Sequence, residues 1–311
     1  ALALSAYLAI HGEISGGTMV ATMMILWRLT GPIQNIFLAA TSLVRIRSNI
    51  RQVENLMRLR GESETGVFQT IRSSVRGTLS FARVSFRYAN DADPVLLGVS
   101  FTVEPGQVVV IAGGNGAGKS TLLKLIERIY IPQAGTIRLN NVDIRQLTAS
   151  DLRSQISYMP QQCELFYGTV AQNLRLVHPS ATDAEVNWAV EMAGLAEDIK
   201  ALPEGFNTRI SNSRSEQLPH GFRQRLSLAR TILKPAALVL LDEPGTGMDQ
   251  SGEEALMRCI EWLRGRATLV MVSHRPGHMR LADSVILMQQ GSVFAMGPFE
   301  NIKDKIMSRL S

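Results

Sequence analysis

Residues 113–121 read G-G-N-G-A-G-K-S-T, and they follow the apolar run V-V-V-I at residues 108–111. The next residues, 122–126, read L-L-K-L-I and are expected to be helical. A strand, a glycine-rich turn and a helix in this order are typical of a phosphate-binding loop. Gly113 and Gly118 allow a backbone path that side chains would block, so that successive N–H groups and the helix N-terminus can point at one polyphosphate. The stretch therefore predicts nucleotide binding.

The side chains at the end of this loop suit a nucleotide that carries a magnesium ion. Lys119 is expected to place its ammonium group on the β- and γ-phosphates, and Ser120 to offer its hydroxyl to Mg²⁺. The loop residues expected to contact the nucleotide are Gly113, Asn115, Gly116, Ala117, Gly118, Lys119, Ser120 and Thr121.

The composition is that of an ordinary globular protein. The 311 residues could form one large domain or two, and 45% of them are hydrophobic. The net charge of +5 is modest, and Cys163 and Cys259 have no partner at metal-ligand spacing, which fits a reduced, cytosolic compartment. The chain begins at Ala1 inside an apolar run, without a charged region or a cleavage signal, so we expect a fragment of a longer protein and no signal peptide.

An arginine-rich stretch with few acidic residues follows the first apolar segments. Two interpretations are open: a solvated helix face, or a segment that follows a membrane helix on its cytosolic side. Nucleic-acid binding is disfavoured because no aromatic residues alternate with these arginines. They are Arg45, Arg47, Arg51, Arg58, Arg60, Arg72 and Arg76.

Residues 18–44 are long enough to predict a membrane-spanning helix, although Arg28, Pro32, Gln34 and Asn35 interrupt them. An arginine at the middle of a membrane costs about 2.5 to 3.5 kcal/mol, so Arg28 would face a helix bundle or a water-filled path. A buried helix of a soluble domain is the competing interpretation. The turn-rich residues 11–17 would link two such helices, and the pattern after the apolar segment predicts that the helix continues into water.

A second domain is expected to begin near Gly77. Residues 78–81, 84–88 and 99–103 alternate between apolar and polar side chains, like half-buried antiparallel strands. After the phosphate loop, short β-rich runs alternate with helical stretches, which predicts an α/β core with a largely parallel sheet. These runs are residues 156–159, 238–241, 268–272 and 284–288.

The run at residues 238–241 ends on two carboxylates, Asp242 and Glu243. Ligand sites in such sheets lie at the carboxyl ends of the strands. We therefore expect Asp242 to coordinate Mg²⁺ and Glu243 to polarise the water that attacks the γ-phosphate. An acidic pair after a strand is also common as a helix cap or turn, but the phosphate loop favours the catalytic interpretation.

Together these elements resemble the ATP-binding cassette (ABC) family, specifically the exporters in which membrane helices precede the nucleotide-binding domain in one chain. The resemblance implies that residues 77–311 form a P-loop, ABC-type nucleotide-binding domain with an antiparallel β subdomain and a helical subdomain. It implies that residues 1–60 are the last two membrane helices with their cytosolic extension, and that residues 61–76 are a linker. ATP and Mg²⁺ are the implied cofactors, and the implied assembly is a homodimer or heterodimer through the nucleotide-binding domains.

The resemblance also implies roles for single residues. Tyr88, in F-R-Y, would stack on adenine, an interaction worth about 1 to 3 kcal/mol. Gln161, in Y-M-P-Q-Q, would touch Mg²⁺ and the attacking water, with Gln162 as the adjacent competitor for this role. His274 would contact the γ-phosphate, and Asp249 would meet the partner subunit. For Tyr88 and His274 a purely structural role at a strand end is the alternative. No role is assigned to His11, His178 or His278.

The sequence departs from the family at the signature loop, L-S-G-G-Q, which presents a serine and N–H groups to the γ-phosphate held by the opposite subunit. The aligned residues 218–222 read L-P-H-G-F, and Gly221 is still expected to contact nucleotide. Pro219 has neither a hydroxyl nor an N–H, so two donors are lost, although proline is tolerated at a helix start and His220 could supply another donor. Loss of a transition-state donor lowers a rate by a factor of about 100 to 1,000, which puts the activity of a symmetric homodimer in question.

The first functional hypothesis is an ATP-driven exporter subunit of the inner membrane, with its nucleotide-binding domain in the cytoplasm, that dimerises on ATP and reopens after hydrolysis. One alternative is a regulatory or asymmetric partner subunit that binds ATP and hydrolyses it slowly. Another is a soluble cassette ATPase that acts on nucleic acid or ribosomes, although no nucleic-acid partner is expected. Residues 28–32, R-L-T-G-P, resemble type I secretion exporters, which implies a protein or peptide substrate, a periplasmic adaptor and an outer-membrane channel. Lipid or drug export stays open.

Overall fold

The computed structural model describes residues 15–57, 77–89, 91–210 and 218–310, and before residue 15 only positions 4, 7, 8 and 10–12. The chain divides into two compact units, Ala1–Ser63 and Glu64–Ser311, which are considered separately. The predicted linker at residues 61–76 lies outside the described residues.

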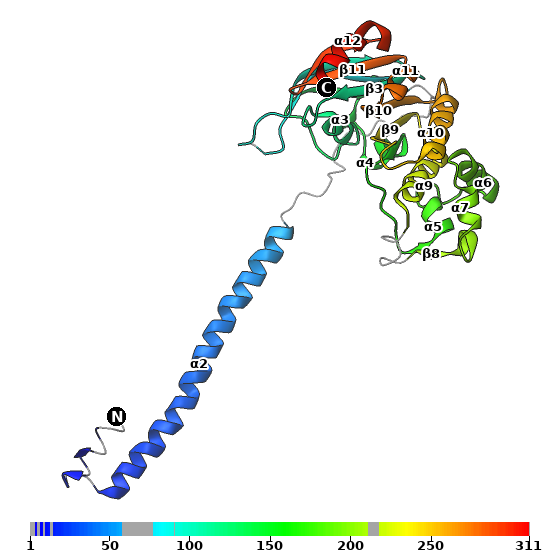
Figure 1. The fold of residues 1–311 in the computed structure, drawn as a ribbon. Coiled ribbons are helices and arrows are strands. Elements are labelled where there is room, and N and C mark those ends of the chain that lie inside the picture. Colours follow the sequence, from blue (N-terminus) through cyan, green and yellow to red (C-terminus); the bar gives the residue numbers. More distant parts are fainter. Residues whose placement is uncertain are drawn as a thin grey trace. The chain divides into compact units, whose positions relative to one another are not determined.

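The first unit contains one long helix, α2 (Gly16–Met57), which runs without a break through Pro32 (Figure 1). This helix covers both the apolar stretch and the predicted extension after it. Across the described residues, however, no helix combines the length and the apolar composition that crossing a membrane requires. The prediction of a membrane span at residues 18–44 is therefore not supported, because Arg28, Gln34 and Asn35 lie within the stretch and lower its mean hydropathy.

The second unit is built around a sheet with the strand order β12-β11-β3-β10-β9-β6. All neighbours are parallel except β12, which pairs antiparallel with β11 at the edge. The largely parallel sheet predicted from the sequence is confirmed, and each β-rich run predicted after the phosphate loop forms one of its strands. The strands are β3 (Val108–Gly113), β6 (Ile156–Met159), β9 (Leu238–Asp242), β10 (Thr268–Val272), β11 (Ser284–Gln289) and β12 (Ser292–Gly297).

A smaller antiparallel sheet has the order β2-β1-β4-β5. The two runs predicted at residues 78–81 and 84–88 are one strand, because the chain continues through a bulge at which Arg83 adopts a left-handed φ of 49°. The strands are β1 (Leu79–Phe86), β2 (Leu96–Val103), β4 (Ala134–Leu139) and β5 (Val142–Asp143), and a separate pair joins β7 (Gly168–Thr169) to β8 (Arg209–Ile210).

Helices flank the sheet and form a subdomain beside it. Figure 1 shows α5, α6 and α7 gathered around α9, which agrees with the predicted helical subdomain. The helices are α3 (Lys119–Ile126), α4 (Ala149–Ser154), α5 (Val170–Arg175), α6 (Asp183–Met192), α7 (Ala196–Lys200), α9 (His220–Leu233), α10 (Gln250–Leu263), α11 (Pro276–Leu281) and α12 (Phe299–Leu310), with short 3₁₀ turns at Ile144–Gln146 and Gly205–Asn207.

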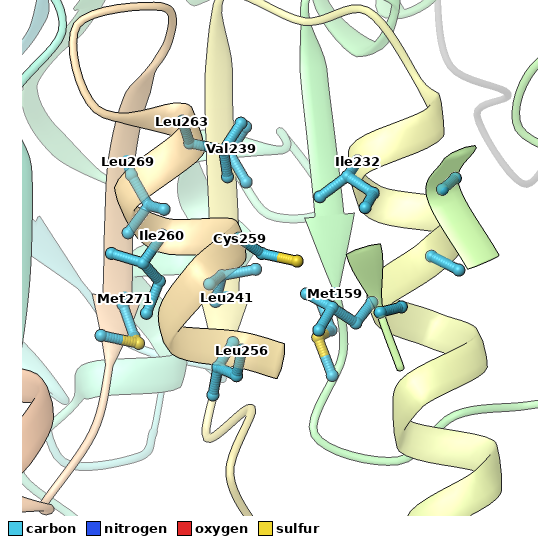
Figure 2. Packing of buried hydrophobic residues seen from close by; sticks show 14 of the residues in the cluster. Met159, Ile232, Val239, Leu241, Leu256, Cys259, Ile260, Leu263, Leu269 and Met271 are labelled. Carbon is cyan, nitrogen blue, oxygen red and sulfur yellow. The ribbon is translucent and has the colours of Figure 1, made fainter. Parts of the chain in front are cut away.

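The main sheet is buried on both faces. Along β3, Val108, Val110 and Ala112 join one hydrophobic cluster, while Val109 and Ile111 join the other, as the alternation of side chains along a strand requires. Figure 2 shows how α10 packs its apolar face on β9 and β10. The labelled side chains of this contact are Leu256, Cys259, Ile260 and Leu263 from the helix and Val239, Leu241, Leu269 and Met271 from the strands. This packing fixes the strand ends that carry the site.

Candidate functional site

The carboxyl ends of β3, β9 and β10 meet at one edge of the main sheet. The strand register pairs Val272 of β10 with Ile111 of β3 and with Asp242 of β9. The segments that follow these positions therefore begin beside one another: the phosphate loop after β3, Glu243 after β9 and His274 after β10. This edge is where ligands bind in parallel α/β sheets.

Two glycines of the phosphate loop have no room for a side chain. Gly113 has a φ of 151°, and a Cβ there would lie 2.4 Å from the carbonyl oxygen of Met288. Gly118 has a φ of 94°, and a Cβ there would lie 2.6 Å from Leu96 Cδ2. These positions need the conformational freedom of glycine. The loop consequently turns sharply enough to start α3 directly at Lys119.

The Lys119 ammonium group lies over the phosphate loop. Its Nζ donates hydrogen bonds to the carbonyl oxygens of Gly113 and Gly114, both at 2.9 Å. Burial lowers the pKa of Lys119, and the nearby carboxylates of Glu243 and Asp242 partly oppose this shift. A cation held at the mouth of the loop is suited to phosphate oxygens.

Ser120 and Asp242 form the oxygen-rich part of the site. The Ser120 hydroxyl donates a hydrogen bond of 3.1 Å to Asp242 Oδ1. Asp242 is 4% exposed, and burial raises its pKa, while the bond from Ser120 lowers it. A hydroxyl beside a buried carboxylate fits Mg²⁺, which takes oxygen ligands and is usually held by one or two carboxylates together with substrate phosphates. The residues present therefore suit the implied ion.

Glu243 and His274 form a pair beside Lys119. His274 Nδ1 lies 2.9 Å from Glu243 Oε2, and the carboxylate is largely buried while the imidazole is exposed. Glu243 has a left-handed φ of 49°, and its backbone N–H donates to the Val272 carbonyl oxygen at 3.0 Å. A non-glycine residue seldom adopts this conformation, and such strain is concentrated at functional sites.

Tyr88 approaches the phosphate loop from the smaller sheet. Its hydroxyl lies 3.0 Å from Thr121 Oγ1, either atom being able to donate. Its ring packs edge-on against Phe86 and against Tyr130, with centroids 5.0 and 5.1 Å apart. Sequence reasoning missed Tyr130, although a second aromatic residue shortly after the helix of the phosphate loop was a visible signal. Tyr88 is held by three side chains and remains about half exposed, so its ring is available for stacking.

The two candidate glutamines after β6 occupy different surroundings. The backbone carbonyl of Gln161 accepts a hydrogen bond of 2.6 Å from Gln224 Nε2 of α9. Gln162 instead lines a cavity of about 460 Å³ between this loop and the start of α9. The other lining residues are Cys163, Glu164, Leu165, His220, Arg223 and Gln224. The structure thus ties the backbone of Gln161 to α9 and leaves its predicted role at Mg²⁺ a prediction.

Residues 218–222, for which the family resemblance predicts an altered signature loop, lie at the start of α9. Pro219 is the residue before the helix, makes no side-chain cap, and accepts a hydrogen bond at its carbonyl oxygen from the Arg223 N–H at 3.2 Å. His220 lies against the backbone of Gly247, where a Cβ would be 2.2 Å from His220 Nδ1. Gly221 follows in the first turn, where a Cβ would lie 3.5 Å from the Gly247 carbonyl oxygen. The helix therefore begins normally after the proline, and its first residues contact the loop that follows Glu243.

Asp249 ends that loop and caps α10. Its Oδ1 accepts a hydrogen bond of 2.9 Å from the Gly252 N–H, and the Ser251 hydroxyl donates to the same carboxylate. The bond from Gly252 is the largest cause that lowers the pKa of Asp249. Its implied meeting with a partner subunit remains a prediction.

Five of the predicted residues thus converge at the sheet edge, namely Lys119, Ser120, Asp242, Glu243 and His274. Tyr88 adjoins the loop through Thr121. Gln161, Gly221 and Asp249 lie on neighbouring segments and make the backbone and capping contacts described above.

Comparison with known proteins identifies the domain. Residues 96–246 match the family described as ABC transporter. The chain is 31% identical over 303 residues to YgaD of Bacillus subtilis (strain 168), an ATP-binding/permease protein named for multidrug export, which covers 97% of this chain and 52% of that protein. It is 32% identical over 287 residues to an ATP-dependent lipid A-core flippase of Chromobacterium violaceum, covering 92% of this chain and 49% of the flippase.

A solved structure gives the same result. The structure of a bacterial Atm1-family ABC exporter with ATP bound matches 96% of this chain and 53% of its own chain, with a TM-score of 0.78 and 25% sequence identity. The chain spans about half the length of these relatives. Their names give no support to the predicted protein or peptide substrate, adaptor or outer-membrane channel. The matched residues and the converging site show that this chain contains an ATP-binding domain of the ABC transporter family.

Proposed function

We propose that this chain is the ATP-hydrolysing part of an ABC exporter, with residues 77–311 as the nucleotide-binding domain. The observation that carries the proposal is the convergence of a cation, a hydroxyl and three further polar side chains at the carboxyl edge of one parallel sheet. Lys119 would hold the β- and γ-phosphates, and Ser120 and Asp242 would hold Mg²⁺. The ion, when bound, would supply positive charge to the phosphate oxygens.

The paired side chains of Glu243 and His274 would act on the attacking water. The Glu243 carboxylate is acceptor-only when ionised and can orient a water by accepting its hydrogen bond. The His274 imidazole, 2.9 Å away through Nδ1, would hold the carboxylate in place beside the γ-phosphate. Phosphoryl transfer depends mainly on positioning and on electrostatic stabilisation, and this pair is suited to the positioning of the water.

The proposed assembly is a dimer through the nucleotide-binding domains, in which the start of α9 faces the nucleotide of the opposite subunit. The whole protein, of which this chain spans about half, would lie in a membrane with this domain in the cytoplasm. The relatives named for multidrug export and for lipid A-core favour an amphipathic or lipid-like cargo over a polypeptide.

A second candidate function is a subunit that binds ATP and hydrolyses it slowly beside a different partner. The observation in its favour is Pro219, which precedes the first turn of α9 with neither an N–H nor a hydroxyl to donate. Both functions share the nucleotide site, so hydrolysis is the property that separates them.

The test is ATP turnover of the purified chain compared with Glu243→Gln. This substitution keeps the shape of the side chain and removes the charge that orients water, so turnover should fall by a factor of about 100 to 1,000 while ATP binding is kept. Glu261→Gln, at an exposed position on α10, is the matched control and should leave turnover unchanged. Equal, negligible turnover of the unmodified chain and Glu243→Gln, with ATP still bound, would reject the hydrolysing subunit and favour the second candidate.

A further inference from the structure

A closed ring of hydrogen bonds surrounds the backbone on both sides of His274. Ser273 Oγ lies 2.7 Å from Nδ1 of His278, and His278 Nε2 lies 2.7 Å from Glu253 Oε1. The other carboxylate oxygen of Glu253 accepts a hydrogen bond of 2.5 Å from the Arg275 guanidinium group. The backbone N–H of Arg275 donates to Ser273 Oγ at 3.1 Å and closes the ring.

The donors and acceptors of this ring fit only one arrangement of protons around a neutral histidine. The Glu253 carboxylate accepts hydrogen bonds, so His278 Nε2 must carry the proton that it shares with Glu253. Nδ1 is then an acceptor, and the Ser273 hydroxyl donates to it while accepting from the Arg275 N–H. His278 is fully buried, and burial lowers its pKa, with Glu253 acting in the opposite direction. The neutral form satisfies every polar atom of the ring.

The ring is also tied to the loop between Glu243 and Asp249. The Arg275 guanidinium donates a second hydrogen bond of 2.5 Å to the Gly245 carbonyl oxygen. A Cβ at Gly245 would lie 2.8 Å from Glu253 Oε2 and 3.0 Å from Arg275 Cζ, so the absence of a side chain at this position lets the ion pair approach the loop. Glu253 itself lies in the first turn of α10, the helix that Asp249 caps.

These contacts connect the two sides of His274 to two different elements. Ser273 precedes it and is held by the buried His278, and Arg275 follows it and is held by Glu253 and Gly245. Ser273 is further anchored by its N–H, which donates to the Ile111 carbonyl oxygen of β3 at 3.2 Å. The backbone that carries the exposed His274 imidazole is therefore held by hydrogen bonds at Ser273 and at Arg275.

We propose that His278 is a positioning residue for ATP hydrolysis: through Ser273 and Glu253 it sets His274 against Glu243 and couples this pair to the loop that ends at Asp249. This inference rests on the proposed function, since His274 and Glu243 are its point of action. His278 touches neither the phosphate loop nor Asp242, so it should affect turnover and leave ATP binding unaffected.

The kinetic test replaces His278 with leucine, which fills a buried site and cannot hydrogen-bond. The expected result is a fall in kcat of about tenfold to 100-fold with KM for ATP unchanged within twofold, because a displaced reacting group loses rate and the phosphate loop is untouched. His278→Gln, which can still donate to Glu253, should recover part of the rate. His178→Leu, at a half-buried histidine outside the site, is the matched control.

Testing His278→Leu in a second variant, His274→Ala, distinguishes a positioning role of His278 from a general structural role. In a His274→Ala chain, His278→Leu should cause no further loss of kcat, because the residue through which it acts is already absent. The same fractional loss in both backgrounds, or an unchanged kcat in the single variant, would overturn the proposal. If His278→Leu does not fold, Glu253→Gln takes its place, since it keeps the side-chain volume and removes the charge that binds both His278 and Arg275.

A measurement that needs no hydrolysis keeps this inference distinct from the proposed function. The sequence has five histidines, few enough for their ring nitrogens to be assigned by ¹⁵N NMR of the full chain. His278 should give the signal of a neutral ring protonated at Nε2, and Glu253→Gln should shift the signals of both His278 and His274. A ring protonated at Nδ1, or a His274 signal that Glu253→Gln leaves in place, would reject the network even in a chain that turns over no ATP.

Discussion

The phosphate loop and the start of α9 both face nucleotide in the proposed dimer, but they differ in the hydrogen-bond donors that they offer. The loop supplies the Lys119 ammonium, the Ser120 hydroxyl and a helix N-terminus. The start of α9 is also a helix N-terminus, but Pro219 before it has no N–H or hydroxyl to donate, and the His220 imidazole lies against Gly247. In the proposed dimer, ground-state binding would depend on the first region and transition-state stabilisation on both, so we expect that binding and turnover can be changed separately.

The largest effect, on the affinity for ATP, is expected at Lys119 in the phosphate loop. Lys119→Ala removes the cation at the mouth of the loop and should weaken ATP binding by about 100-fold or more, because a charge-assisted contact to phosphate is lost in a half-buried site. Titration with a fluorescent ATP analogue measures this directly. Turnover should disappear in parallel, since no hydrolysis is possible without binding.

Lys200→Ala is the control for this substitution. Lys200 is exposed at the end of α7 and pairs with Glu197 of the same helix, so its removal should leave the affinity for ATP unchanged. Unaltered ATP binding by Lys119→Ala would contradict the assignment of the phosphate loop and, with it, the exporter proposal.

The sequence predicted the phosphate-loop region well because its chemistry is local. The strand, the glycines at 113 and 118, Lys119 and Ser120 lie within one short segment. Asp242 and Glu243 end a short apolar run, and the phosphate loop favoured a site there over a helix cap or turn. The location of these groups at one edge was expected because ligand sites in largely parallel sheets lie at the carboxyl ends of the strands, whereas the order of the strands was not predicted.

The contacts across the domain were not predictable in this way. The pairing of His274 with Glu243, the packing of Tyr130 on Tyr88 and the burial of His278 depend on residues that the fold brings together from distant segments. Side-chain burial and rotamers decide these contacts, and neither can be read from a pattern of residue types. The membrane span predicted at residues 18–44 is not supported among the described helices, since Arg28, Gln34 and Asn35 lie among its apolar residues.

A smaller effect, an increase in ATP turnover, is expected from substitutions at the start of α9. The double substitution Pro219→Ser with His220→Gly provides a hydroxyl and an N–H where the proline has neither, and frees the loop around Gly247. If these donors reach the γ-phosphate on the partner subunit, turnover should rise by about tenfold to 100-fold while the affinity for ATP stays within a factor of two. Steady-state ATPase assays at saturating ATP measure this.

Pro203→Ser, in the loop after α7, is the matched proline control and should leave turnover unchanged. Unchanged turnover in the double variant would mean that the start of α9 does not limit hydrolysis. The contrast between the two regions would then have no catalytic consequence.

The smallest effect concerns the stability of the phosphate-loop side. Glu127 follows α3, the helix that begins with Lys119 and Ser120, and its Oε2 is buried with no hydrogen-bond partner among the described residues. Burial raises the pKa of Glu127 to about 7, against the opposing charges of Arg153 and Lys234. The folded state therefore holds the proton more tightly than the unfolded state, in which the carboxyl has its ordinary pKa of 4.5.

The sign of the pH dependence follows from this difference. Below pH 4.5 both states are protonated and Glu127 has no net cost, whereas between pH 4.5 and 7 the unfolded state loses the proton first, so the free energy of unfolding falls as the pH rises. Glu127→Gln stays neutral throughout and should match the unmodified chain at pH 4.5 but exceed it by up to about 3 kcal/mol at pH 8. Urea unfolding at several pH values measures the difference, with Glu197→Gln at an exposed position as a control that should show no such trend. A constant difference across this range would show that the Glu127 carboxylate is well solvated or paired, and that α3 holds Lys119 and Ser120 in place without a pH-sensitive cost.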